Sequence, residues 1–348
     1  MKAEGRQLSA RQGRLLVTAS ILGAFLLFAI VGPALLPTTF DNDSSVMLEA
    51  AENLVRVDTS YKVIADLIGM FGYMTLSYII IFISSFIVAA VISIPKHIET
   101  FGVAVLSIVA SAPLWMIRPQ KEILVALLTS ISLFVLILAR SSAKRIVVVS
   151  LLYFSYAYAA GRIYFYLIPA AWVYLLTFTG MKNAGRFMLL GLTGIALLLA
   201  PSRVLLELNE VRDVLNALVV LNHSANTAFL NPDHGVGAGA FLVNYFYAAV
   251  RLNFPVIFNI RAQEIFLTLF SLSWFLLIMA GIRSGEPVAR FVACLILAHL
   301  LVEWIFEPDL GSYLRHVSSI IVLIIPLLYT RDLELSGPSI GAAEIAQA

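Results

Sequence analysis

The sequence predicts an all-α protein, a polytopic bundle of transmembrane helices with further helices at the membrane surface. Of its 348 residues, 60% are hydrophobic and 13% are charged, and the mean hydropathy is +0.93. A soluble domain carries about a quarter charged residues. Apolar stretches of about 20 residues, the length that crosses roughly 30 Å of hydrocarbon as a helix, also recur along the chain. These observations predict a membrane protein and exclude an ordinary soluble enzyme.

Ten apolar stretches are predicted to span the membrane. The first follows basic residues, as in a signal peptide, but it is longer than a signal peptide's apolar segment and no small-residue cleavage site follows it. Only Gly161 and Arg162 separate the fifth stretch from the sixth, so these are either two short helices or one long tilted helix. The predicted spans lie at about 15–37, 70–94, 101–117, 122–139, 146–160, 163–180, 187–202, 264–282, 288–306 and 315–330.

The charge of the connecting loops predicts the orientation. With ten spans both termini lie on one side of the membrane, and the short loops of that side carry most of the basic residues. Because cytoplasmic loops are enriched in Lys and Arg, both termini are predicted to be cytoplasmic. The chain is thus expected to form a single integral membrane domain over residues 1–335, followed by a loose cytoplasmic tail at 336–348.

Two outer segments, at about 38–69 and 203–262, are too long to be simple turns. In the first, apolar residues from Met47 to Val55 recur at helical spacing, and in the second, apolar and polar residues alternate from Leu205 to Leu218. Both patterns predict amphipathic helices at the membrane surface. An irregular stretch containing His234 follows in the second segment, which is too apolar to be disordered and is therefore expected to be functional.

Basic side chains at the outer ends of the spans are the first candidates for a binding site. Charge is costly inside a bilayer and usually faces a protein interior or a water-filled cavity. The guanidinium fork of arginine matches phosphate oxygens, and a lipid-linked diphosphate would supply those oxygens at this depth. The alternative is that they are membrane anchors and ion-pair partners. The residues are Arg118, Lys121, Arg162, Arg203, Arg212, Arg251, Arg261 and Arg315.

The segment from Arg118 to Glu122 connects the third and fourth predicted spans. Pro119 favours a helix start, so Arg118 and Lys121 are expected at the mouth between these spans. Backbone amides at a helix N-terminus favour an anion, and two neighbouring cations strengthen that preference. A plain turn with membrane anchors would explain the same residues.

The segment from Glu303 to His316 combines three carboxylates, an arginine and a histidine within 14 residues. Glu303 and Glu307 are four residues apart and would share one face of a helix. Glu307, Asp309 or His316 could remove a proton from an acceptor hydroxyl while Arg315 holds a donor phosphate. The alternative is a polar turn on the outer face.

Other candidates for a general base lie in the two long outer segments. Asp41 and Asp43 follow the first span and could act as a base or hold a divalent cation, although a helix N-cap also explains an aspartate there. His223 and His234 occur in the second segment. The chain has one cysteine, which excludes disulfides within it, and it has no phosphate-binding loop and no zinc-protease motif. Because the cytoplasmic connections are short, any chemistry is expected in the membrane or on its outer face.

This layout resembles the integral-membrane glycosyltransferases of the GT-C kind, and among them most the polymerases of O-antigen and exopolysaccharide repeat units. The resemblance covers most of the chain and includes the acidic first outer loop with Asp41 and Asp43. It also includes Arg118-Pro119-Gln120-Lys121-Glu122, the large late outer loop, and Glu307-Pro308-Asp309 followed by Arg315-His316. It implies a bacterial inner-membrane enzyme that needs no metal or other cofactor.

The resemblance also implies partners and a mechanism. The donor would be a growing chain on a polyprenyl diphosphate, and the acceptor a second polyprenyl-linked oligosaccharide. Membrane lipid surrounds the enzyme, a chain-length regulator protein can act with it, and no nucleic acid is involved. One of His223, Glu307, Asp309, His316, Asp41 and Asp43 would be the base. The diphosphate would be bound by Arg118, Lys121, Arg162, Arg203, Arg251 and Arg315.

Two alternatives remain open. GT-C monosaccharide transferases use polyprenyl-phosphate sugars and place an acidic base in the first outer loop, which Asp41 and Asp43 would fit. Many of them carry a soluble outer domain that this chain lacks, so its length favours a polymerase. A secondary transporter or a flippase for lipid-linked sugars is an alternative of another class. Transporters bind near the bilayer midplane, whereas here the charges gather at the outer ends of the spans.

Overall fold

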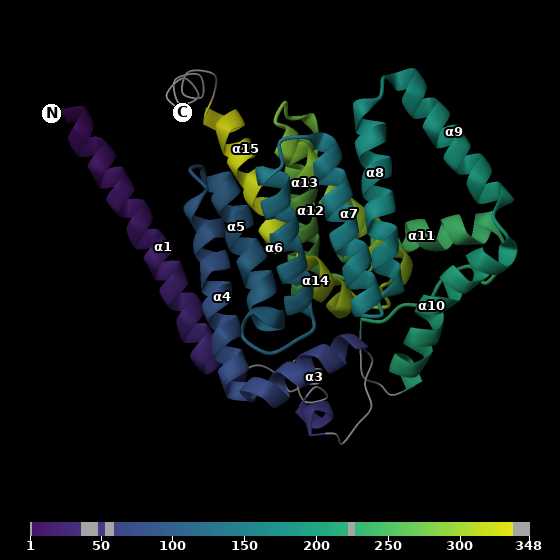
Figure 1. The fold of residues 1–348 in the computed structure, drawn as a ribbon, viewed down its shortest axis with the longest axis horizontal. Coiled ribbons are helices and arrows are strands. Elements are labelled where there is room, and N and C mark those ends of the chain that lie inside the picture. Colours follow the sequence, from purple (N-terminus) through teal and green to yellow (C-terminus); the bar gives the residue numbers. More distant parts are fainter. Residues whose placement is uncertain (1, 36–47, 53–58, 222–226, 337–348) are drawn as a thin grey trace. The chain divides into compact units, whose positions relative to one another are not determined.

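The structure, a computed structural model, describes residues 2–35, 48–52, 59–221 and 227–336. Over these residues the chain is helical, as predicted, and a single isolated bridge between Ala228 and Asp309 is the only β-type pairing they contain. Figure 1 shows the order of the helices along the chain. Asp41, Asp43 and His223 lie outside the described residues, and so does most of the predicted tail.

Within the described residues, six helical segments are long and apolar enough to cross a membrane, which indicates a membrane protein. Two further pairs of helices pass the same test only together, because each is bent, by 91° and 52°. The number of spans is therefore six to eight, and the predicted ten are not confirmed. The six segments are Gln12–Pro33, Tyr73–Ser93, Ile98–Met116, Ile163–Gly180, Ala262–Arg283 and Pro287–Phe306, and the bent pairs are Asn183–Leu199 with Ser202–Val214 and Leu310–Ser319 with Ile321–Ser336.

The difference in count arises from two of the predicted spans. Helix α6 (Glu122–Leu138) is apolar but has only 17 residues, so it extends about 26 Å, less than the hydrocarbon thickness. Helix α7 (Ser142–Ala159) carries Lys144 and Arg145 in its first turn and is less apolar. Gly161, with φ 65°, separates α7 from the short helix η3 (Ile163–Tyr166) and α8 (Leu167–Gly180). The fifth and sixth predicted spans are therefore two helices.

The helices divide into two compact units, and each is considered by itself. The first consists of residues 1–133, 159–161 and 318–348, with α1 (Lys2–Leu35), α3 (Thr59–Phe71), α4 (Tyr73–Ser93), α5 (Ile98–Ser111) and α15 (Ile324–Ser336). Helix α4 packs against α1 and α5, and α15 also packs on α5. The carboxylate of Asp332 on α15 is buried and accepts hydrogen bonds from the backbone N–H groups of Lys96 and His97. This contact fixes the turn between α4 and α5.

The second unit consists of residues 134–158 and 162–317. Its centre is α13 (Pro287–Phe306), which packs against α8, α12 (Ala262–Arg283) and α11 (Ala238–Asn253) and is buried over most of its length. Two polar contacts fix its position: Trp172 Nε1 donates to the carbonyl of Phe291 at 2.9 Å, and the Tyr153 hydroxyl lies 2.7 Å from His299 Nε2. This unit also contains α7, η3, α9 (Asn183–Leu199), α10 (Ser202–Leu221), the short helix η4 (Pro255–Ile257) and most of α14 (Leu310–Ser319).

The predicted surface helices can be compared only in part. In the first outer segment, residues 36–47 and 53–58 lie outside the described residues, while 48–51 are helical and α3 follows. In the second, α10 covers the alternating stretch predicted to be helical. The helical conformation of α10 is confirmed, and its position at the membrane surface stays a prediction.

Candidate functional site

The link between α13 and α14, residues 307–309, brings three side chains of the predicted acid–base segment together. They are Glu303, Glu307 and His316. Glu303 lies in the last turn of α13, and the N–H of Glu307 closes that turn by donating to the Glu303 carbonyl at 2.8 Å. Pro308 disfavours a helical conformation of the residue before it, and Glu307 is extended, with ψ 124°. The helix ends here, so the chain turns back.

Asp309 starts the next helix. Its Oδ1 accepts hydrogen bonds from the backbone N–H groups of Gly311 at 2.8 Å and Ser312 at 2.9 Å, as an N-cap aspartate does. Helix α14 therefore begins at Leu310. Two turns later it carries His316, which faces both glutamates. The four-residue spacing, the proline and the cap explain why this segment folds into a cluster.

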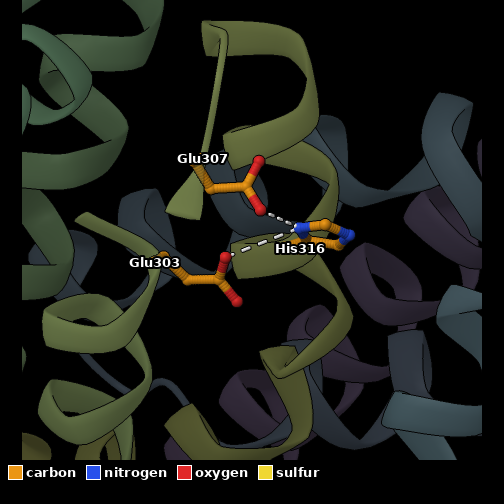
Figure 2. A group of neighbouring side chains, drawn as sticks. All are labelled: Glu303, Glu307 and His316. Atoms are coloured by element: carbon orange, nitrogen blue, oxygen red, sulfur yellow. Dashed lines mark hydrogen bonds and ion pairs between the residues drawn. The ribbon is translucent and has the colours of Figure 1, made fainter. Parts of the chain in front are cut away.

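The geometry of the cluster is shown in Figure 2. His316 Nδ1 contacts Glu307 Oε1 directly and lies 3.5 Å from Glu303 Oε2. The three side chains are nearly enclosed, with 4% of Glu303, 5% of Glu307 and 12% of His316 exposed. The ring Nε2 of His316 points away from both carboxylates. An imidazole held at Nδ1 by a carboxylate is oriented and presents Nε2 for proton transfer.

The charge of the cluster follows from its contacts. Burial by itself would raise the pKa of the Glu307 carboxyl, but the positive charge and the hydrogen bond of His316 outweigh it and lower the pKa to about 2. Glu307 is therefore a carboxylate that accepts from His316. Burial raises the pKa of Asp309, although hydrogen bonds from Ser312 and Gly311 oppose this. When both ring nitrogens of His316 are protonated, it forms an ion pair with Glu307. When the ring is neutral, its Nδ1–H donates a hydrogen bond to the Glu307 carboxylate.

The same three side chains are the group of the described residues that could hold a metal ion, since their ligand atoms lie within 4.8 Å of one another. A metal bound there would have to displace the direct contact between His316 Nδ1 and Glu307 Oε1. The sequence prediction gave this segment an acid–base role without a metal.

Arg212 of α10 positions the link; it was one of the basic candidates for a binding site but not one of the predicted diphosphate ligands. It is buried, and its guanidinium donates to the carbonyls of Trp304, Ile305 and Glu307, at 3.1 Å for Ile305 and 3.0 Å for Glu307. These are carbonyls that the end of a helix leaves without intrahelical partners. Arg212 therefore caps α13 through its side chain and fixes the backbone from which Glu307 projects.

One turn later on α10, Asn216 continues this contact. Its amide donates to the carbonyl of Pro308 at 2.9 Å, and the side chain is buried. Arg212 also donates to Asn231 Oδ1 at 2.6 Å. The alternating pattern predicted α10 as a surface helix, but no local signal shows that two of its polar side chains bind the link more than ninety residues later.

The arginines of the second unit that were predicted to bind phosphate differ in the residues they contact. Arg315 follows Asp309 and precedes His316 on α14, and its charge acts on the Asp309 carboxyl. Arg162 donates to the hydroxyl of Tyr164, whose ring lies 5.6 Å from that of Phe306 at the end of α13. These two arginines are associated with the same end of α13 and α14 as the cluster.

Arg203 and Arg251 have contacts of their own. Arg203 is 89% exposed and forms a 3.0 Å ion pair with Glu207 one turn away. The Arg251 guanidinium lies 4.6 Å from the ring centre of Phe258. His234 is exposed, and its Nδ1 is 3.9 Å from Asp213. No contact of these residues with the glutamate–histidine cluster occurs among the described interactions.

Arg118 and Lys121 belong to the first unit and are buried within it. Arg118 donates to the carbonyl of Pro33 in α1 at 3.1 Å. Lys121 donates to the hydroxyl of Tyr61 in α3 at 2.9 Å and lies 4.4 Å from the centre of that ring. Both cations thus have partners within their own unit.

Comparison with protein-family models, curated proteins and solved structures gave no match for this chain.

Proposed function

We propose that this protein is a membrane glycosyltransferase that polymerises polyprenyl-diphosphate-linked repeat units of a surface polysaccharide. The observation that supports it is the enclosed pair of His316 and Glu307 at the end of a membrane helix, with Arg315 next to the histidine in the chain. Such a pair is suited to remove a proton from a hydroxyl, and a guanidinium on the same helix is suited to a phosphate leaving group.

The proposed reaction is a displacement at the anomeric carbon of the donor sugar. The acceptor hydroxyl attacks this carbon, its proton passes to His316 Nε2, and the bond between the anomeric carbon and the diphosphate oxygen breaks. The electron pair of that bond leaves with the polyprenyl diphosphate. Glu307 stabilises the imidazolium that forms, which is the role of a carboxylate behind a catalytic histidine.

In this proposal Arg315 and Arg162 together bind the diphosphate. Arg315 precedes His316 on α14, and Arg162 reaches the end of α13 through Tyr164 and Phe306. Developing negative charge on a leaving group is stabilised most by donors that are fixed before the reaction. The protein then lies in a bacterial inner membrane with both termini in the cytoplasm, and a chain-length regulator protein can act with it.

The test is the substitution His316→Gln. It removes the base and keeps a side chain of similar size, so we expect a loss of chain extension of about 100-fold or more. The measurement is the length distribution of the surface polysaccharide of the producing cells, resolved by gel electrophoresis, at equal amounts of membrane-inserted protein. The matched control is His234→Gln, which removes an exposed histidine and should leave polymer length unchanged. Polymer of normal length in the His316→Gln strain contradicts the proposal.

A GT-C monosaccharide transferase remains the alternative within the same class. Its base would be Asp41 or Asp43, which the structure does not describe. The double substitution Asp41→Asn with Asp43→Asn separates the two. It leaves a polymerase that uses His316 active, and it inactivates a transferase that uses the first outer loop.

One observation favours a proton-coupled transporter as a second candidate. Glu303 is a buried carboxylate within a membrane helix, and such groups occur in proton relays. A transporter with a Glu303→Gln substitution would lose pH-driven uptake of its substrate into vesicles. A polymerase would show no such uptake in the unsubstituted protein.

A further inference from the structure

The first unit contains a cavity of about 370 Å³ between α1, α4 and the start of α5. In Figure 1, α1 and α4 meet near the C-terminal end of α1, and α1 leans away from α4 toward its own N-terminus. The cavity lies where they diverge, since its lining includes Gly13 and Val17 of α1 and Ile92 of α4. Phe101 of α5 supplies another apolar wall.

The depth of the cavity in the membrane follows from the ends of three spans. Arg14 lies at the beginning of the segment Gln12–Pro33, Ser93 at the end of Tyr73–Ser93, and Ile98 at the beginning of Ile98–Met116. All three spans thus reach a membrane boundary at this cavity. The phosphate groups of phospholipids lie at the same boundary, just outside the hydrocarbon.

The charge of the lining is positive. Arg14, Lys96 and His97 line the cavity, and none of its lining residues in the described part of the chain is acidic. Arg14 and Lys96 are exposed, so their charged groups reach the opening. The nearest buried carboxylate, that of Asp332, is already bound by the backbone N–H groups of Lys96 and His97 and by the hydroxyl of Thr100.

The turn between α4 and α5, which contains Lys96 and His97, is also held in place before any ligand binds. Asp332 binds two consecutive amides of the turn, and His97 Nε2 lies 3.1 Å from the Ser336 hydroxyl. A turn whose backbone is already fixed loses less conformational entropy on binding than a mobile one. A guanidinium and an ammonium at a membrane boundary recognise the phosphate of a lipid headgroup, and the apolar walls suit an acyl chain.

We infer that this cavity binds an anionic phospholipid, with its phosphate at Arg14 and Lys96 and its acyl chain against Val17, Ile92 and Phe101. The site is distinct from the glutamate–histidine cluster and does not depend on the proposed sugar transfer. A zwitterionic headgroup fits less well because its ammonium group would meet the basic side chains.

The first experiment measures lipid binding to the purified full-length chain in detergent by native mass spectrometry, with phosphatidylglycerol and phosphatidylcholine as probes. We expect phosphatidylglycerol to bind more tightly, and Arg14→Gln with Lys96→Gln to weaken its binding about thirtyfold, since each basic group near the membrane contributes about fivefold. The control Arg140→Gln with Lys144→Gln removes two exposed charges elsewhere and should not change binding. The charge-conserving variant Arg14→Lys with Lys96→Arg should keep it.

The second experiment fills the cavity. A Cβ atom added at Gly13 or at Gly23 meets nothing within 4 Å, so both positions of α1 accept a side chain. Gly13 lines the cavity and Gly23 does not. Gly13→Leu should abolish phosphatidylglycerol binding, and Gly23→Leu should leave it unchanged.

Three outcomes would overturn the inference. The first is equal binding of both lipids by the unsubstituted protein. The second is loss of binding in Gly13→Leu but not in Arg14→Gln with Lys96→Gln, which indicates an uncharged apolar occupant. The third is full competition by inorganic phosphate, which indicates a soluble anion as the ligand.

Discussion

Two polar segments between helices, Arg118 to Glu122 and Glu303 to His316, have the same kind of sequence and different surroundings. Each contains a proline, an acidic residue and at least one cation, and each was predicted to be part of the site. In the second, acid and base side chains contact each other. In the first, the cations bind a carbonyl of α1 and a tyrosine of α3. Composition identifies such segments, but only the structure gives the partner of each charge.

The energetic reason for the difference is desolvation. Arg118 is 3% exposed, and burial lowers the pKa of its guanidinium. A buried cation is tolerated only where the protein supplies acceptors, and the carbonyl of Pro33 is one of them. In the cluster, His316 and Glu307 supply this compensation to each other.

The largest expected effect tests the cluster itself. Glu307→Gln removes the carboxylate that orients His316 and stabilises its charge, so chain extension should fall by about 100-fold or more. The measurement is polymer length at equal amounts of folded protein. Glu264→Gln is the matched control, because Glu264 is also a buried glutamate, on α12. Equal losses in both variants would show that the effect comes from burying an amide and would remove Glu307 from the mechanism.

The next effect tests how the cluster is positioned. Arg212→Gln leaves the carbonyls at the end of α13 without their donor, and we expect a loss of unfolding free energy of about 2–3 kcal/mol. Thermal unfolding in detergent measures it. Arg203→Gln removes an exposed arginine with one ion pair on the same helix and should cost less than about 1 kcal/mol. If the two variants unfold at the same temperature, Arg212 is not a structural cap.

A smaller effect is expected at the first segment. Arg118→Gln loses the hydrogen bond to Pro33, so the free energy of unfolding should fall by about 1–2 kcal/mol while activity per folded molecule stays within about threefold. The control is Lys62→Gln, which removes an exposed charge from α3. An inactive but normally stable Arg118→Gln protein would support the sequence-based prediction that Arg118 binds the diphosphate.

The sequence predicted those features whose causes are local. Apolar stretches predicted membrane helices, and the proline, the Asp309 cap and the four-residue spacing lie within the segment that folds into the cluster. The number of spans was less predictable, because a 17-residue helix such as α6 lies at the limit of the required length. The partners of Arg212 and Arg118 were not predictable, because they are carbonyls 95 and 85 residues away.

The smallest expected effect is a pH dependence of stability. The pKa of Glu307 is lowered from 4.5 to about 2 in the folded protein, so its carboxylate contributes stability that is fully present above pH 4.5. This contribution is lost as the pH falls toward about 2, where the folded protein also takes up the proton. The unsubstituted protein should therefore lose more stability between about pH 6 and about pH 3 than Glu307→Gln does.

Thermal unfolding across this range measures the difference, and Glu207→Gln serves as the control because Glu207 is exposed. Its unfolding temperature should follow that of the unsubstituted protein, since an exposed ion pair contributes little. If Glu307→Gln also follows the unsubstituted protein throughout the acid range, the carboxylate is not held ionised by His316. The cluster would then be a set of neutral hydrogen-bonding groups, and its difference from the Arg118 segment would be one of geometry and not of charge.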